Sequence, residues 1–140
     1  MMRISNWPSA LIAHIDENRD NPFRWGTHDC MLWGASCVEA ITGEDPASEL
    51  RGTYSSALGA YRIIEQSGGF DQTVEKFLAG GAEMRIDLSL AMRGDLVTTT
   101  DDRGRKSLGV CDGLWGVFPG PDFLTFKKRI NLDSIAWRVI

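Results

Sequence analysis

The sequence lacks the features that mark several large classes of protein. In 140 residues it has three cysteines, two histidines and no Cys-x-x-Cys pair. It has no apolar run near the ~18 residues that a membrane-spanning helix needs. It also lacks an excess of basic residues, because the formal net charge is −4. These absences argue against a membrane span, a zinc site and binding to nucleic acid. We expect no cofactor, no metal and no membrane insertion.

The few cysteines also limit the covalent structure. Their odd number excludes a full disulfide framework. Cys30 and Cys37 lie seven positions apart on one expected helix, roughly 10 Å along its axis. The α-carbons of a disulfide lie within about 7 Å of each other, so this pair cannot be bridged while the helix holds. We expect reduced thiols.

A secretion signal is the next missing feature. The first residues, Met1–Ser5, are followed by Asn6, Trp7 and Pro8 rather than by an apolar stretch. We expect synthesis in the cytosol and export only within a larger particle. The hydrophobic content of 43% and the charged content of 24% are ordinary for a globular protein. Residues 1–140 are expected to form a single domain with its own core, because no repeat or low-complexity linker divides them.

The segment Pro22–Cys30 carries the clearest chemical signal. An irregular loop with aromatic residues and a glycine ends there in Asp29-Cys30, and an apolar run of helical character follows. A cysteine in the first turn of a helix lies at the positive end of the helix dipole, which lowers the pKa of a thiol. Cys30 is therefore a candidate nucleophile. Most free cysteines are instead small buried hydrophobic residues, and spacing alone leaves the two interpretations even.

The first half of the chain predicts helices. Leu11 and Ile15 recur at four-residue spacing in the first of them, and His14 flanks that stripe, where a structural role is expected. The second runs from about Asp29 to Thr42 and stops at Gly43. One face of it carries Cys30, Gly34, Cys37, Val38 and Ile41, and is expected to pack on a sheet. Two more helices are predicted over residues 55–66 and 73–79, with Asp71 as the cap of the last.

Beyond residue 80 the pattern changes to short β-type runs separated by Gly, Asp and Pro. These runs cover residues 83–86, 95–99, 108–111, 114–118, 124–128 and 136–140. The connections between them are too short for crossover helices, so the sheet is expected to be antiparallel. The sequence therefore predicts an α+β domain in which N-terminal helices pack on a C-terminal antiparallel β-sheet.

Three of these segments together carry a family resemblance. Asp29-Cys30 opens a helix, Gly94-Asp95-Leu96-Val97 enters a strand, and Ser107-Leu108-Gly109-Val110 forms the next strand. In this order they resemble the NlpC-type branch of the papain-like cysteine peptidases, which are bacterial and phage cell-wall hydrolases. The resemblance covers most of the chain from about Phe23 onward. It implies an NlpC-like fold with Cys30 in the place of the nucleophile.

A narrower resemblance adds a biological setting. The opening Pro-Phe-x-Trp-Gly-x-His-Asp-Cys, the motif Arg51-Gly52-x-Tyr54 and the terminal Ala136-Trp137-Arg138-Val139 are similar to a small phage-encoded group of uncharacterised function. That group is found among tail genes. The resemblance implies a place in a phage tail.

One position departs from the family pattern. Ser107 stands where the family carries its general-base histidine. A serine hydroxyl is not a usable base near neutral pH and does not stabilise a thiolate as an imidazolium does. Only His28 and His14 remain as substitutes. His28 lies two residues from Cys30 in the approach loop, although its ring need not face the sulfur. We expect Ser107 to lie across from Cys30, within roughly 10 Å, a loose allowance beyond direct contact.

These features lead to two main interpretations. The first is a structural component of the tail tip of a phage or phage-like particle, with a degenerate or weak hydrolase centre. The alternative is an active cell-wall peptidase or amidase that assists DNA entry, with Cys30 as nucleophile, His28 as base and Asp29 ordering the loop. A cytosolic cysteine hydrolase unrelated to phage is a third. The first two differ in whether an imidazole lies within hydrogen-bond reach of the Cys30 sulfur.

The first interpretation also predicts partners and location. The expected partners are other tail-tip or baseplate proteins, with peptidoglycan as a second candidate and without nucleic acid. The expected location is the virion tail tip, after synthesis in the host cytoplasm. Aromatic residues are enriched at interface cores, and Trp25, Trp115 and Phe123 are candidates for such contacts.

Overall fold

A computed structural model describes residues 2–78 and 85–139. Its α-helices are α1 (Trp7–Asn18), α2 (Cys30–Thr42), α3 (Ala57–Gln66) and α4 (Phe70–Leu78). Its strands are β1 (Arg85–Asp87), β2 (Leu96–Thr100), β3 (Lys106–Asp112), β4 (Trp115–Pro119), β5 (Leu124–Lys128) and β6 (Ile135–Trp137). Two short 3-10 helices, η1 (Leu88–Leu90) and η2 (Arg129–Asn131), were not predicted. No helix among the described residues is long and apolar enough to cross a bilayer.

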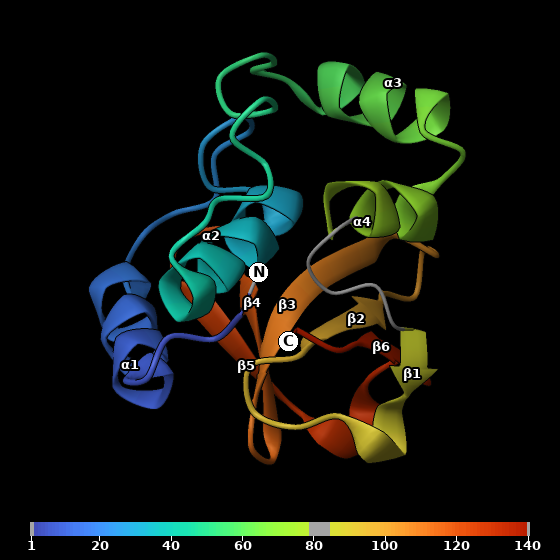
Figure 1. Cartoon of the computed structure of the whole chain (residues 1–140). Helices are drawn as coiled ribbons and strands as arrows, with labels where there is room; N and C mark the ends of the chain where they lie inside the picture. The colour runs from blue at the N-terminus through green and yellow to red at the C-terminus, as the bar shows by residue number, and fades with distance from the viewer. Residues whose placement is uncertain (1, 79–84, 140) are drawn as a thin grey trace.

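The strands form one sheet in the order β1-β6-β2-β3-β4-β5, and each neighbouring pair is antiparallel. Helices α1 and α2 lie side by side, and α2 packs on β3 and β4. In Figure 1, α4 lies close to the sheet and α3 stands beyond it, at the outer edge of the molecule. The predicted α+β arrangement of N-terminal helices on a C-terminal antiparallel sheet is confirmed.

Helix α2 is the central element because it is buried over most of its surface. Its N-cap is Asp29, and its C-cap is Gly43, which adopts the left-handed conformation at φ 84°. A Cβ atom on Gly34 would lie 2.4 Å from a methyl carbon of Leu108, so the glycine lets the helix approach β3 closely. The helix predicted from Asp29 to Thr42, with the face of Gly34 on the sheet, is confirmed.

The boundary of α4 differs from the prediction. The helix begins at Phe70 rather than Thr73, and Asp71 lies inside its first turn instead of capping it. Gly68 and Gly69, at φ 96° and 120°, reverse the chain within two residues, so the helix restarts at once. The predicted stop at Gly80-Gly81 lies outside the described residues, as does part of the strand predicted over 83–86.

The two ends of the chain meet at the buried carboxylate of Asp95, at the entry to β2. This side chain accepts hydrogen bonds from the Arg3 guanidinium at 3.0 Å, the Val139 N–H at 3.1 Å and the Met92 N–H at 2.9 Å. Its residue is 0% exposed. The Gly-Asp-Leu-Val segment therefore has a structural role: it ties the N-terminus, the C-terminus and the central strands together.

Candidate functional site around Cys30

Cys30 opens α2 and faces the start of β3. The Ser107 side chain and the Leu108 backbone N–H both interact with its sulfur and lower the pKa of the thiol. Burial is the larger influence, and with the neighbouring charge of Asp29 it raises the pKa of Cys30 to about 11. The structure therefore confirms that Ser107 lies across from Cys30. The expectation that the helix start lowers the thiol pKa was wrong, because withdrawal from water outweighs the helix dipole here.

Asp29 is the organising residue of the site. One carboxylate oxygen accepts the Leu32 N–H at 3.0 Å and thereby caps α2. The other accepts the Gly26 N–H at 2.9 Å and the Tyr54 hydroxyl at 2.6 Å. Burial and the Asp29 carboxylate both raise the pKa of Tyr54. Asp29 thus fixes the loop before Cys30, in agreement with the ordering role expected of it.

The motif Arg51-Gly52-x-Tyr54 supplies the other half of this scaffold. The Gly52 N–H donates to the Gly26 carbonyl at 3.1 Å. Gly26 has φ 84°, and a Cβ atom there would lie 1.9 Å from the Tyr54 carbonyl oxygen. Arg51 donates to Asp45 at 2.6 Å and also to the Leu32 carbonyl of α2. Sequence reasoning noticed this motif without giving it a role. It holds the Cys30 loop in place.

His28 packs against Trp33 and makes no hydrogen bond to the thiol. The histidine is 7% exposed, and its Nε2 atom has no hydrogen-bond partner. Its ring contacts the Trp33 indole edge to face, with 5.7 Å between the ring centroids. Burial lowers the pKa of His28, which favours the neutral ring. Among the described residues, no hydrogen bond joins either imidazole to the Cys30 sulfur. The geometry therefore brings Cys30, Asp29 and Ser107 together and leaves His28 apart.

His14 packs near Trp33 as well. Its ring stacks on the indole at 5.1 Å with an interplanar angle of 11°, and its Nε2 atom hydrogen-bonds the Ser36 hydroxyl at 2.8 Å. Trp33 in turn donates its indole N–H to the Val117 carbonyl at 2.9 Å. These contacts give His14 the structural role that its position beside the apolar stripe predicts.

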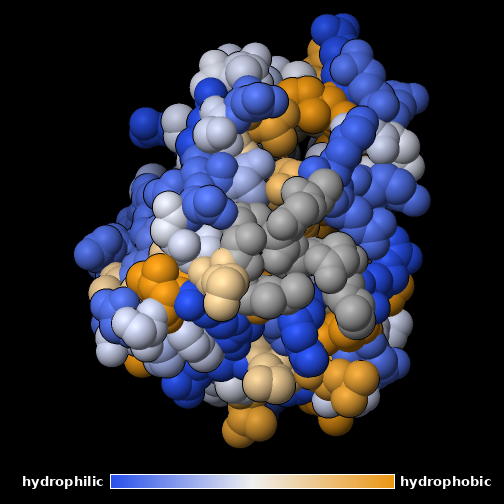
Figure 2. Space-filling model, viewed as in Figure 1, coloured by the Kyte–Doolittle hydropathy of each residue, from blue (hydrophilic) through white to orange (hydrophobic). Residues whose placement is uncertain are grey.

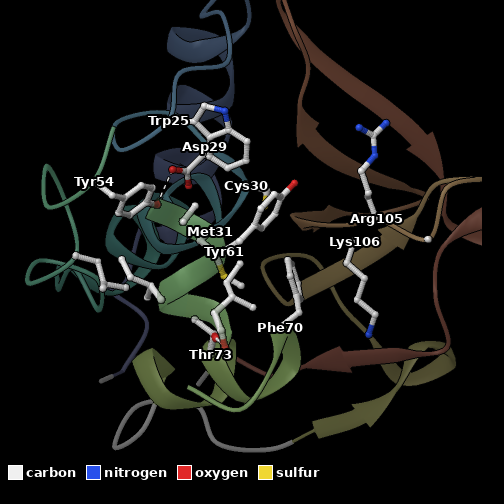
Figure 3. A pocket seen from close by; sticks show the side chains of 15 residues that line it. Trp25, Asp29, Cys30, Met31, Tyr54, Tyr61, Phe70, Thr73, Arg105 and Lys106 are labelled. Carbon is white, nitrogen blue, oxygen red and sulfur yellow. Dashed lines mark hydrogen bonds between the residues drawn. The ribbon is translucent and has the colours of Figure 1, made fainter. Parts of the chain in front are cut away.

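A pocket of about 390 Å³ opens beside Cys30. Helices α3 and α4, the start of α2, the loop that carries Leu50 and Tyr54, and the β2–β3 turn form its walls. Figure 3 shows Tyr61 and Phe70 on one side of Cys30, Tyr54 bonded to Asp29 on another, and Arg105 and Lys106 across the opening. Among the described residues, no cluster of three or more His, Cys, Asp or Glu side chains is arranged to hold a metal ion.

Comparisons with known proteins place the chain in a family. The family model described as "Domain of unknown function (DUF6950)" matches residues 2–139. Among curated proteins, none matches this sequence. A similar solved structure is that of the NlpC/p60 domain of the peptidoglycan hydrolase SagA. It has a TM-score of 0.57 and 18% identity, over 94% of this chain and 97% of that one. The chain thus has an NlpC-like fold, and it belongs to the DUF6950 family.

Proposed function

We propose that this protein is a non-hydrolytic structural component of the tail tip of a phage or phage-like particle, built on the NlpC-like fold of a cell-wall hydrolase. The observation that carries the non-hydrolytic part is the environment of Cys30. Its sulfur meets a serine hydroxyl and a backbone N–H where a cysteine peptidase needs an imidazole.

The chemistry of the thiol follows from this environment. With a pKa of about 11, only about one molecule in ten thousand carries the thiolate at pH 7. A general base would have to remove the proton during attack, and Ser107 cannot do so near neutral pH. His28, whose Nε2 atom is buried without a partner against Trp33, is not placed to replace it.

Exposed apolar side chains support the assembly part of the proposal. Leu114 is 77% exposed and Ile130 is 87% exposed, and with Trp115 they line one hollow where β4 begins and β5 ends. Contiguous exposed apolar surface is typical of interaction sites. Phe123 is also exposed, whereas Trp25 is half-buried between the rings of Phe23 and Tyr61. The motif resemblance to tail-associated proteins supports the location.

Two measurements test the two parts separately. Purified peptidoglycan incubated with the protein should release no fragments above the level of Cys30→Ala, which should fold normally because a small side chain is retained. Mass spectrometry of purified particles should find the protein at a fixed copy number. A protein found only as a free cytosolic monomer would contradict the structural role.

The second candidate function is an active peptidoglycan peptidase or amidase. It is favoured by one observation: Cys30 keeps the position of the nucleophile at the start of α2 and lines a pocket. Robust fragment release that Cys30→Ala abolishes would establish it. Loss of the same activity in His28→Ala would then assign the base to His28.

A further inference from the structure

The pocket beside Cys30 has walls of hydrocarbon and aromatic rings. Its apolar lining includes Trp25, Met31, Tyr61, Ile63, Ile64 and Phe70. Helix α3 contributes the largest share, although only one of its residues, Ala60, is buried. Figure 2 shows hydrophobic side chains gathered around a hollow at the top of the molecule, in the region where Figure 1 places α3. The apolar face of α3 thus borders an open cavity, although Ile64 on that face also packs against the core.

The charged groups at the pocket already have partners within the protein. Asp29 accepts three hydrogen bonds. Arg105 pairs with Asp101 at 2.8 Å, and Lys106 pairs with Asp71 on α4 at 3.0 Å. A charged ligand would therefore enter a largely apolar space without a free counter-ion, which is costly. The pocket favours an uncharged, apolar occupant over the charged peptides of a cell wall.

The volume of the pocket indicates the size of that occupant. An apolar cavity of roughly 150 Å³ holds benzene. At about 390 Å³, this pocket has room for roughly a dozen carbon atoms. Even the largest amino-acid side chain would leave part of it empty. We propose that the pocket binds an uncharged hydrocarbon chain of about ten carbons, with Cys30 and Met31 at one wall and the apolar face of α3 at the other.

This inference concerns the same cleft as the proposed function but does not depend on whether the protein cuts peptidoglycan or rides in a particle. Its test is ligand binding, measured by calorimetry with hexanol, octanol and decanol. Each added methylene should tighten binding about fourfold, because about 0.8 kcal/mol accompanies each buried CH₂. Decanoate and decyl ammonium should bind more weakly than decanol. Equal or tighter binding of either charged probe would overturn the apolar assignment.

A matched pair of variants on α3 locates the site. Ile63 lines the pocket, whereas Leu58, on the same helix, is 60% exposed and lies outside it. Ile63→Glu should abolish decanol binding and Leu58→Glu should leave it unchanged. If Ile63→Glu does not fold, Ile63→Trp narrows the pocket without adding a charge and should weaken decanol binding more than it weakens hexanol binding. Unchanged decanol affinity in a folded Ile63 variant would refute the proposal.

A chemical readout places the ligand against Cys30. Cys37 and Cys111 are 0% exposed, so Cys30 is the accessible thiol. Saturating decanol should slow maleimide labelling of Cys30 at least tenfold. Mass spectrometry measures the labelling rate at a pH where labelling is readily followed. An unchanged labelling rate in a decanol-saturated sample would show that the chain binds elsewhere and would overturn the inference.

Discussion

The carboxylate of Asp29 allows a prediction that joins the stability of the fold to the chemistry of the thiol. One oxygen accepts the Leu32 N–H, and the other accepts the Gly26 N–H together with the Tyr54 hydroxyl. Asp29→Asn replaces one of these oxygens with an NH₂ group. Whichever way the amide turns, a buried backbone N–H then faces another donor.

The magnitude follows from the number of bonds that are lost. A buried donor left without an acceptor costs about 1–3 kcal/mol, and the remaining bonds lose the assistance of the charge, about 1 kcal/mol more. We expect Asp29→Asn to lower the free energy of unfolding by about 2–4 kcal/mol, a large part of the ~5–15 kcal/mol of a typical domain. Urea denaturation followed by tryptophan fluorescence measures this loss.

The same substitution should act on Cys30. The charge of Asp29 is among the causes that raise the pKa of the thiol, so its removal should lower that pKa. Tyr54→Phe is the control: it removes one hydrogen bond, costs about 1–2 kcal/mol, and keeps the charge of Asp29. In Asp29→Asn/Tyr54→Phe the two losses should be less than additive, because they share a bond. An Asp29→Asn protein of unchanged stability, or one with a higher Cys30 pKa, would refute the reasoning.

Three further predictions concern other parts of the fold. Gly34→Ala should lower the free energy of unfolding by about 1 kcal/mol, because the cost of overpacking against Leu108 (~1–3 kcal/mol) exceeds the gain in helix propensity. Urea titration measures this change, and a stabilised variant would contradict the close contact with Leu108. Asp95→Asn should cost about 3 kcal/mol because the Arg3 guanidinium loses its carboxylate partner, and a neutral result would exclude the clamp between the chain ends. The pKa of His28 lies below its usual 6.5, so the folded state binds fewer protons than the unfolded state, and stability should fall as the pH drops below about 6.5. His28→Phe should weaken that dependence and leave the part due to His14, whose pKa is also lowered by burial, and an unchanged profile would rule out His28 as a source.

The sequence predicted the parts of the fold that local patterns encode. The stripe of Cys30, Gly34 and Ile41, with Gly43 at the end, fixed α2, and β5 has the limits that were expected. The predicted helix boundaries were wrong where the chain turns sharply, as at Gly68-Gly69 before α4. A positive φ at two successive glycines is not visible as a helix start in a periodicity analysis.

The candidate site could be predicted only where local sequence patterns specify it. The alignment of strand motifs correctly predicted that Ser107 lies opposite Cys30. The position of a residue along its strand decides whether it faces the start of the helix that packs on the sheet. The pKa of the thiol could not be read from its place in the helix, because burial by residues distant in sequence decides it. The roles of Tyr54 and Arg51 depend on a loop-to-loop contact through Gly26, which no local pattern specifies.

The central claim, that Cys30 lacks an activating base, can be tested most directly by the pH dependence of its alkylation. The rate of iodoacetamide modification at Cys30, followed by mass spectrometry, should rise about tenfold per pH unit from pH 7 to pH 10 without a plateau, as a pKa of about 11 requires. A rate that levels off below pH 8 would show an activated thiolate and would contradict the account.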